Sequence, residues 1–171
     1  MKGAEPLQRI AVGVVVERRP ATSPWIEHVW RPVDVLAGAP EAAPWTPLPG
    51  ARGADTFYAG PAEVELYRSE TTNYRDNLAT GQPSLWVVLR PTGGDPPFSV
   101  VTVTADPAEG EAFTEAGNDL VDTVPMPAAI KDALEAFIAD HHVERAFYKR
   151  QRDSGAGGVL GGGRKPREGG P

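Results

Sequence analysis

QRIAVGVVVER, residues 8–18, alternates β-branched side chains with smaller ones, which predicts a β-strand with two different faces. One face carries Ile10, Val12, Val14 and Val16, and the other carries Ala11, Gly13 and Val15. Small residues on the second face leave room for a close neighbour. We therefore expect a central strand whose second face is tightly covered by another part of the chain.

Four more segments are rich in β-branched and aromatic residues and are predicted to be strands: 27–36, 62–68, 84–90 and 98–104. Because these strands follow one another in pairs, we expect them to join residues 8–18 in one antiparallel-dominated sheet. Pro32 cannot donate to a strand ladder, so its strand is expected at an edge or at a bulge. A further short strand is expected over residues 119–124.

Glycine and proline mark the connections between these strands. Residues 37–53 hold four prolines and predict an irregular surface loop that Trp45 anchors. Gly60 and Pro61 predict the turn of a hairpin. In its second strand we expect Val64 and Leu66 to face inward, and the outward residues to be Glu63, Glu65 and Tyr67.

Residues 85–89, LWVVL, are a continuous apolar run of strand length, which is typical of a strand buried on both faces. We therefore expect Val14, Trp86 and Val88 to be fully buried.

Two short helices and one long helix are expected. Ser69 is a suitable N-cap for a helix over residues 70–79. Asp106 has Pro107 after it and an acidic residue three positions later, which predicts a helix over residues 107–116. Its buried face is expected to carry Ala112 and Phe113.

The longest helix is expected over residues 127–148, which contain no internal glycine or proline. Its apolar stripe consists of Ile130, Leu134, Phe137, Ile138 and His141.

These elements predict an α+β fold with an antiparallel-dominated sheet, flat or curled into a partial barrel, two short helices and one long C-terminal helix. Residues 8–152 are expected to form a single domain, and residues 1–7 a flexible N-terminus. Residues 153–171 are expected to be a disordered, glycine-rich basic tail, because they have too few apolar side chains to offset the entropy of ordering.

Composition excludes several kinds of site. The 171 residues include no cysteine, which excludes disulfides, Cys-ligated zinc and Cys-ligated iron–sulfur clusters. No apolar run approaches the roughly 18–20 residues of a membrane-spanning helix, and the start of the chain does not resemble a secretory signal. We therefore expect a cytoplasmic protein that does not enter the membrane.

The charge is unevenly distributed along the chain. From Arg145 to the end there are seven basic and two acidic residues, whereas the rest holds ten basic and 21 acidic residues. Because nucleic-acid binding depends on neutralising phosphates, the acidic body is not expected to bind nucleic acid. The basic end is either a solvated tail or a docking surface for an acidic partner.

The tryptophans and the basic end of the long helix are the candidates for partner binding. Three tryptophans fall within 21 residues, where they either pin the proline-rich loop to the sheet or contact a partner. The helix end carries more cations than favourable interaction with the helix dipole requires. The candidate partner-binding residues are therefore Trp25, Trp30, Trp45, Arg145, Phe147, Tyr148, Lys149, Arg150 and Arg152.

Catalytic and metal-binding patterns are weak. No serine lies in a Gly-x-Ser-x-Gly motif. His141 and Glu144 are three apart on one helical face, a spacing that can ligate a metal, but a site needs three or four converging ligands and the sequence has no second such pair. We therefore predict no catalytic, cofactor-binding or metal-binding residue.

Several stretches together resemble one family: VGVVVERR (12–19), HVWRPVDVLAGAP (28–40), FYAGPAEVELYRSET (57–71), YRDNL (74–78), PSLWVVLR (83–90), VPMP (124–127) and HHVERAFYKR (141–150). They are similar to the proteobacterial domain-of-unknown-function family 3305. The resemblance spans nearly all of residues 8–152 and does not include the glycine-rich tail.

The resemblance implies a link to molybdenum-dependent formate dehydrogenase, because genes of family members tend to lie beside those of the enzyme and its maturation factors. We therefore expect a non-catalytic accessory or assembly protein whose partner is a formate dehydrogenase subunit or maturation factor. The alternative is a binder of the molybdenum cofactor or of a pterin phosphate, or an enzyme of that cofactor's pathway. An anion site of that kind would use Arg18, Arg19 and Arg31. A pocket lined by these arginines would favour the alternative, and an exposed tryptophan patch would favour a protein partner.

Overall fold

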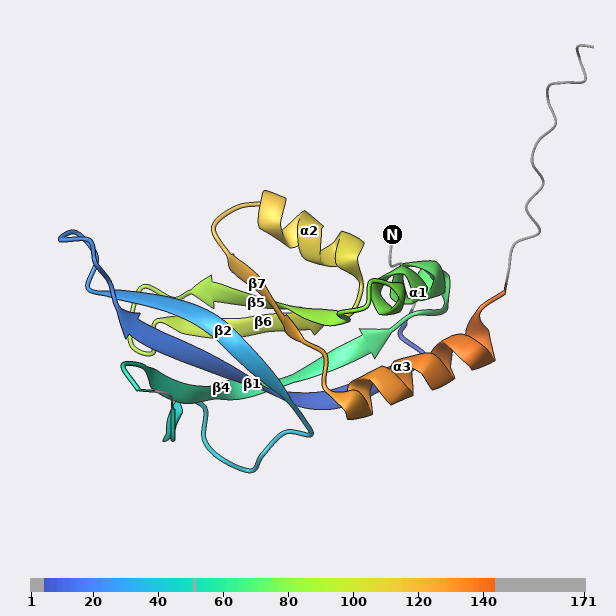
Figure 1. Ribbon diagram of the computed structural model, residues 1–171, viewed down its shortest axis with the longest axis horizontal. Helices are drawn as coiled ribbons and strands as arrows, with labels where there is room; N and C mark the ends of the chain where they lie inside the picture. The colour runs from blue at the N-terminus through green and yellow to red at the C-terminus, as the bar shows by residue number, and fades with distance from the viewer. Residues whose placement is uncertain (1–4, 51, 144–171) are drawn as a thin grey trace, which may run out of the picture.

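The computed structural model describes residues 5–50 and 52–143, which fold into two antiparallel sheets and three α-helices (Figure 1). The first sheet, in the order β2-β1-β4-β3, consists of β1 (Gln8–Pro20), β2 (His28–Ala37), β3 (Thr46–Leu48) and β4 (Asp55–Leu66). The second, in the order β6-β5-β7, consists of β5 (Ser84–Pro91), β6 (Phe98–Thr104) and β7 (Leu120–Pro125). The helices are α1 (Thr71–Ala79), α2 (Pro107–Glu115) and α3 (Ala128–His141).

The antiparallel α+β class is confirmed, but the expectation of one sheet is wrong. β4 lies beside β6, and β2 beside β7, without sharing a strand ladder, so the two sheets do not close into a barrel. Neighbouring strands pair locally, which their composition predicts. The chain changes sheet between β4 and β5, where α1 intervenes, and strand composition does not predict that step.

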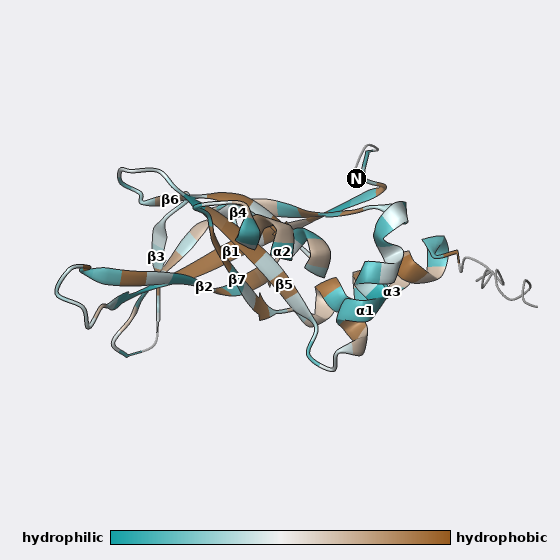
Figure 2. Cartoon of the chain, turned by 90° about the horizontal axis from the view of Figure 1, so that it is seen from above, coloured by the Kyte–Doolittle hydropathy of each residue, from teal (hydrophilic) through white to brown (hydrophobic). Residues whose placement is uncertain are grey.

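The core lies between the two sheets. From β1, Val12, Val14 and Val16 are fully buried, and β5 contributes Leu85, Val87 and Leu89. Figure 2 shows the hydrophobic residues that run along the middle of β1. The buried side chains of α3 belong to the same cluster, so the described residues share one hydrophobic core.

The small second face of β1 is closely covered, as its sequence predicts. A Cβ built on Gly13 would lie 2.8 Å from Pro40 Cδ and 2.9 Å from Tyr58 Cε1. The segment after β2 returns over this face and is held by the Gly38 N–H, which donates to the Ala11 carbonyl at 2.9 Å. Any larger side chain at position 13 would push this cover outward.

Two irregularities shape the first sheet. β2 is an edge strand of the first sheet. Its register with β1 shifts so that Val33 has no opposite residue, which places a bulge next to Pro32. The strand of Pro32 is therefore both at an edge and bulged, as predicted. The predicted hairpin at Gly60 is wrong, because β4 runs continuously through it. Gly60 has a φ of 138°, and the register shift opposite it leaves Ala59 unpaired, so the glycine serves a β-bulge and not a turn.

Two further expectations for this sheet need correction. Within the predicted irregular loop, Thr46–Leu48 forms the short strand β3, which pairs with β4. Tyr67, expected to face outward, is buried, and its hydroxyl donates to Glu65 Oε1 at 2.7 Å. The inward positions of Val64 and Leu66 are confirmed.

Ser69 does not cap α1. A short 3₁₀ turn over Arg68–Glu70 precedes the helix, so Glu70 occupies the N-cap position, and its side chain makes no capping hydrogen bond. Asp106 does cap α2, since its side chain accepts from the Ala108 N–H at 2.9 Å.

The buried face of α2 differs from the prediction. Ala112 is exposed, Phe113 is half-buried, and the buried residue is Gly110, which packs on Trp86. Val14 and Val88 are fully buried as expected, but Trp86 is only half-buried, because α2 covers part of its ring.

The apolar stripe of α3 is confirmed, with Ile130, Leu134 and Phe137 buried. The helix ends at His141, because His142 has extended backbone angles, and residues 144–148 of the predicted helix lie outside the described residues. The proposed tail, 153–171, lies outside them too. No helix in the described part of the chain is long and apolar enough to span a membrane.

Candidate functional site

The structure separates the three clustered tryptophans. Trp30, in β2, and Trp45, just before β3, lie in one aromatic cluster with their ring centroids 5.9 Å apart. Trp25 lies in the turn between β1 and β2, away from that cluster, and is 90% exposed. The interpretation that the tryptophans pin their segments therefore fits Trp30 and Trp45, whereas Trp25 is not part of that cluster and is exposed to solvent.

The aromatic cluster links both sheets at one end of the molecule. The Trp30 ring lies 5.9 Å from Phe57 of β4 and 6.0 Å from Phe98 of β6. Trp45 lies 6.0 Å from Phe57. Since all four rings are partly buried and pack against the core, Trp30 and Trp45 pin their segments to the sheets.

Arg18 covers the outside of this cluster. Its guanidinium carbon lies 5.5 Å from the centre of the Trp30 ring and 5.2 Å from that of Phe57, a cation–π geometry. Its Nη2 donates to Asp55 Oδ2 at 2.7 Å. Arg18 therefore has both a stacking and an ionic partner within the protein.

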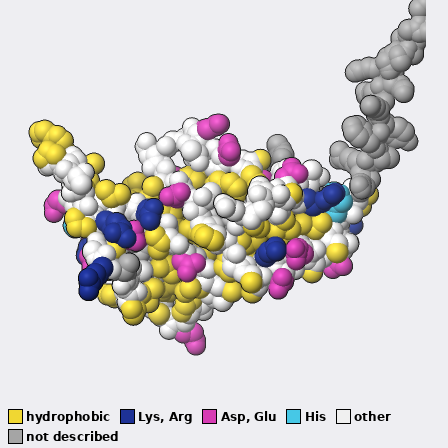
Figure 3. Space-filling model, in the orientation of Figure 1, with side chains coloured by type: hydrophobic (Ala, Val, Ile, Leu, Met, Phe, Trp, Pro, Cys, Tyr) yellow, Lys and Arg dark blue, Asp and Glu magenta, His cyan; other side chains and the backbone are white. Residues whose placement is uncertain are grey.

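The turn between β1 and β2 presents apolar side chains to solvent. Trp25 is followed in the turn by Ile26, 56% exposed, and near the start of β2 by Val29, 52% exposed. Figure 3 shows hydrophobic side chains at the end of this projecting hairpin, at the upper left. We call Trp25, Ile26 and Val29 the hairpin tip.

Hydrogen bonds fix the backbone of the hairpin tip. Ser23 Oγ accepts from the Trp25 N–H at 3.1 Å, and the Ala21 N–H donates to the Glu27 carbonyl at 3.1 Å. A turn held in this way loses little conformational entropy when it binds a partner.

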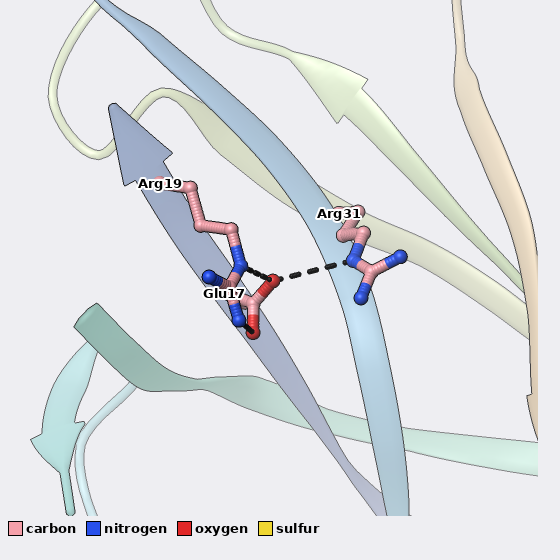
Figure 4. A network of polar contacts seen from close by, with 3 residues as sticks. All are labelled: Glu17, Arg19 and Arg31. Carbon is pink, nitrogen blue, oxygen red and sulfur yellow. Dashed lines mark hydrogen bonds and ion pairs between the residues drawn. The ribbon is translucent and has the colours of Figure 1, made fainter. Parts of the chain in front are cut away.

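Glu17 lies between two of the candidate arginines, and its residue is 7% exposed (Figure 4). Arg19 donates to it through Nε at 2.7 Å and through Nη2 at 3.3 Å, and Arg31 Nε donates at 3.2 Å. The hydrogen bond from Arg19 is the main cause that lowers the pKa of Glu17, and Arg31 adds to it, whereas burial acts in the opposite direction.

Arg18, Arg19 and Arg31 therefore each have a carboxylate partner within the protein. They also do not line the hollow beside the aromatic cluster, of about 500 Å³, whose walls include Pro44, Trp45, Pro61, Pro96 and Phe98. That hollow is mostly apolar, and its described lining residues offer no basic side chain to a phosphate group.

The remaining predicted residues are placed as follows. His141 packs on Phe137 with ring centroids 4.5 Å apart, and Glu144 lies outside the described residues. Within residues 5–50 and 52–143, no group of three or more His, Cys, Asp or Glu side chains could hold a metal ion. The candidates at the basic end also lie outside the described residues, namely Arg145, Phe147, Tyr148, Lys149, Arg150 and Arg152.

Sequence reasoning missed Ile26 and Val29 as companions of Trp25. Val29 belongs to the segment predicted as a strand, where apolar residues are ordinary, and Ile26 directly precedes that segment. It also missed Phe57 and Phe98, because no local spacing connects β4 with β6.

Comparison with protein families gives a match that covers most of the chain. A family described as "Protein of unknown function (DUF3305)" matches residues 11–151. No curated protein and no solved structure matches the chain.

Proposed function

The chain belongs to the DUF3305 family, and from that premise we propose that it is a non-catalytic accessory or assembly protein that docks to a protein partner through the hairpin tip. We propose further that the partner is a subunit or maturation factor of a molybdenum-dependent formate dehydrogenase, and that the encounter takes place in the cytoplasm. The partner's identity rests on the resemblance described above.

The exposure of Trp25 is the observation that carries the docking proposal. Tryptophan is enriched among the residues that dominate binding energy at protein interfaces, because it buries a large area when it enters a partner's pocket. Here the residue is 90% exposed on a hydrogen-bonded turn, and two further exposed apolar residues, Ile26 and Val29, follow it within four positions. Solvated apolar side chains on an ordered turn favour a binding role over a packing role.

The positions of the arginines favour docking over binding of a pterin phosphate at Arg18, Arg19 and Arg31. Two of these arginines hold the Glu17 carboxylate, and the third pairs with Asp55. An anion bound there would have to compete with carboxylates that the protein already supplies.

A pull-down from the native host tests the proposal. The tagged full chain is compared with Trp25→Ala and with a control, Leu7→Ala, which also truncates an exposed apolar side chain but lies just before β1, at the end of that strand away from the hairpin tip. We expect the wild type and the control to recover formate dehydrogenase subunits or maturation factors, and Trp25→Ala to lose them at an unchanged melting temperature. Equal recovery of these proteins by all three chains, or recovery by none, would refute the proposal.

A further inference from the structure

A hollow of about 550 Å³ lies between the start of α1 and the end of α3. Its walls carry two arginines, two histidines and three hydroxyl side chains, and among the described residues that line it none is acidic. This lining is unusual for a chain whose formal net charge is −6. The sequence gives little sign of it, because its residues come from two segments, 68–75 and 141–143, that are distant along the chain.

The packing of α1 on α3 holds the hollow in place. Tyr74 of α1 contacts Phe137 of α3 with ring centroids 6.1 Å apart, and both side chains are buried. The Tyr74 hydroxyl also accepts from the Tyr67 N–H at 2.9 Å, which fixes the chain just before Arg68. The walls therefore rest on rigid elements.

A hydrogen-bonded chain orders three of the lining side chains. Arg75 Nη1 lies 2.7 Å from His142 Nε2, and since arginine only donates, this ring nitrogen accepts. His142 Nδ1 then carries the hydrogen and donates to Thr71 Oγ1 at 2.9 Å. The hydroxyl of Thr71 keeps its own hydrogen, which it can donate to a ligand.

Within residues 5–50 and 52–143, the arginines of the hollow have no carboxylate partner. Among the described residues, Arg68 makes no ion pair, and the guanidinium of Arg75 has its polar contact with the ring of His142. Glu70 is the acid nearest to Arg68 in sequence, and its carboxylate accepts from Ser69 Oγ and Asn73 Nδ2 at 3.2 Å each. Figure 3 shows basic side chains beside a histidine at the α1–α3 end of the molecule, far from the hairpin tip.

We propose that this hollow binds the phosphate group of a small phosphorylated molecule. A phosphate monoester presents several acceptor oxygens, which match the guanidinium groups of Arg68 and Arg75 and the Thr71 hydroxyl. The backbone N–H groups in the first turn of α1 add partial positive charge at the same place. The hollow is larger than phosphate alone requires and falls in the size range of small-molecule sites, so its remaining volume accommodates the organic part.

Titration of the full chain with phenyl phosphate, inorganic phosphate and benzoate, followed by calorimetry, tests this proposal. We expect phenyl phosphate to bind one site per chain and benzoate to bind at least about tenfold more weakly, because it has fewer acceptor oxygens and less charge. Tighter binding of phenyl phosphate than of inorganic phosphate identifies a phosphorylated organic ligand. If phenyl phosphate and inorganic phosphate bind equally tightly, the ligand of the hollow is free phosphate and not a phosphorylated organic molecule.

The variants Arg68→Gln and Arg75→Gln should each weaken binding of phenyl phosphate about tenfold, the loss expected for one charged hydrogen-bond donor. Arg52→Gln removes another exposed arginine outside this hollow and should leave binding unchanged. Because the lost side chains are exposed, the melting temperatures should stay equal. Absence of binding, an equal effect of Arg52→Gln, or tighter binding of an oligoglutamate peptide than of phenyl phosphate would overturn the proposal. None of these results depends on the hairpin tip, so the two proposals fail separately.

Discussion

Gly110, in α2, lies directly against the indole of Trp86 in β5: a Cβ built on the glycine would fall 2.2 Å from Trp86 Cγ. Gly110→Ala should therefore lower the free energy of unfolding by about 1–2 kcal/mol. Overpacking costs of this kind run to about 1–3 kcal/mol, and the better helix propensity of alanine offsets up to about 1 kcal/mol. Urea denaturation measures the change.

Gly94→Ala is the matched control for that substitution. Gly94 lies in the loop between β5 and β6, with no atom within 4 Å of a built Cβ and no positive φ. Its change in unfolding free energy should stay within about 0.5 kcal/mol. If Gly110→Ala behaved like this control, the indole would have room to move away and α2 would not be docked on it.

The contact between Gly110 and Trp86 also shows what sequence could and could not predict about the fold. The strands follow from periodicity and composition, and the cap of α2 follows from Asp106 and Pro107, since these signals are local. A glycine inside a helix is destabilising by its own propensity, and only the ring opposite it explains its place. The sequence around Gly60 likewise predicts a turn where the structure has a bulge, because both require the same conformational freedom of the glycine.

Substitution of Trp30 should mainly reduce the stability of the protein, whereas substitution of Trp25 should mainly reduce partner binding. Trp30→Ala removes the ring at the centre of the aromatic cluster and should lower the free energy of unfolding by about 2–3 kcal/mol, somewhat less than for a fully buried tryptophan. Trp25→Ala should change it by less than about 0.5 kcal/mol, because the ring is exposed. Thermal and urea denaturation of both variants provide the comparison. A large loss of stability in Trp25→Ala would mean that the hairpin tip packs against the protein itself.

Glu17 should make a pH-dependent contribution to stability. Its pKa in the folded protein is lowered from 4.5, chiefly by the hydrogen bond from Arg19, so its ionised form is favoured by folding. The stabilisation is fully present above pH 4.5 and is lost as the pH falls through the lowered pKa. Glu17→Gln should therefore be less stable than the wild type at pH 7, by about 1–2 kcal/mol for a hydrogen-bonded charge with partly exposed partners.

The difference between wild type and Glu17→Gln isolates this carboxylate. Burial raises the pKa of Asp106, so its ionisation changes stability with pH in the direction opposite to that of Glu17. Asp106 is present in both the wild type and Glu17→Gln, so its contribution cancels in the difference between them. Urea denaturation at pH 7 and at several values below pH 4.5 should show the difference shrinking. A difference that stays constant over this range would mean that the ionisation of Glu17 contributes nothing.

The candidate site was less predictable than the fold. Tryptophan content pointed to residues 25–45, but the same residue type pins a loop at Trp45 and is exposed at Trp25. Which role applies depends on whether partners from β4 and β6 reach the ring, and these partners are distant in sequence. The candidate arginines were identified by charge alone, and the internal carboxylates that engage them are visible only in the folded chain.

The basic residues after α3 provide the last prediction. Lys149, Arg150 and Arg152 follow the described residues, in a chain whose remainder is strongly acidic. An acidic partner surface would attract them, and reversing their charge would replace attraction by repulsion. Reversal of all three to glutamate should therefore weaken capture of the formate dehydrogenase partner at least about tenfold, while the melting temperature stays nearly constant.

The tail offers a matched control with the same number of charges, because Arg164, Lys165 and Arg167 can be reversed in the same way. If the charges act only through the overall electrostatic field of the protein, both triple variants should lose the same amount of capture. If the residues after α3 form a docking surface, capture should fall mainly when Lys149, Arg150 and Arg152 are reversed. Capture assays at two salt concentrations, with a melting curve for each protein, distinguish these outcomes. Unfolding of the first variant would assign its basic residues to contacts within the acidic body, and unchanged capture would remove them from the docking surface.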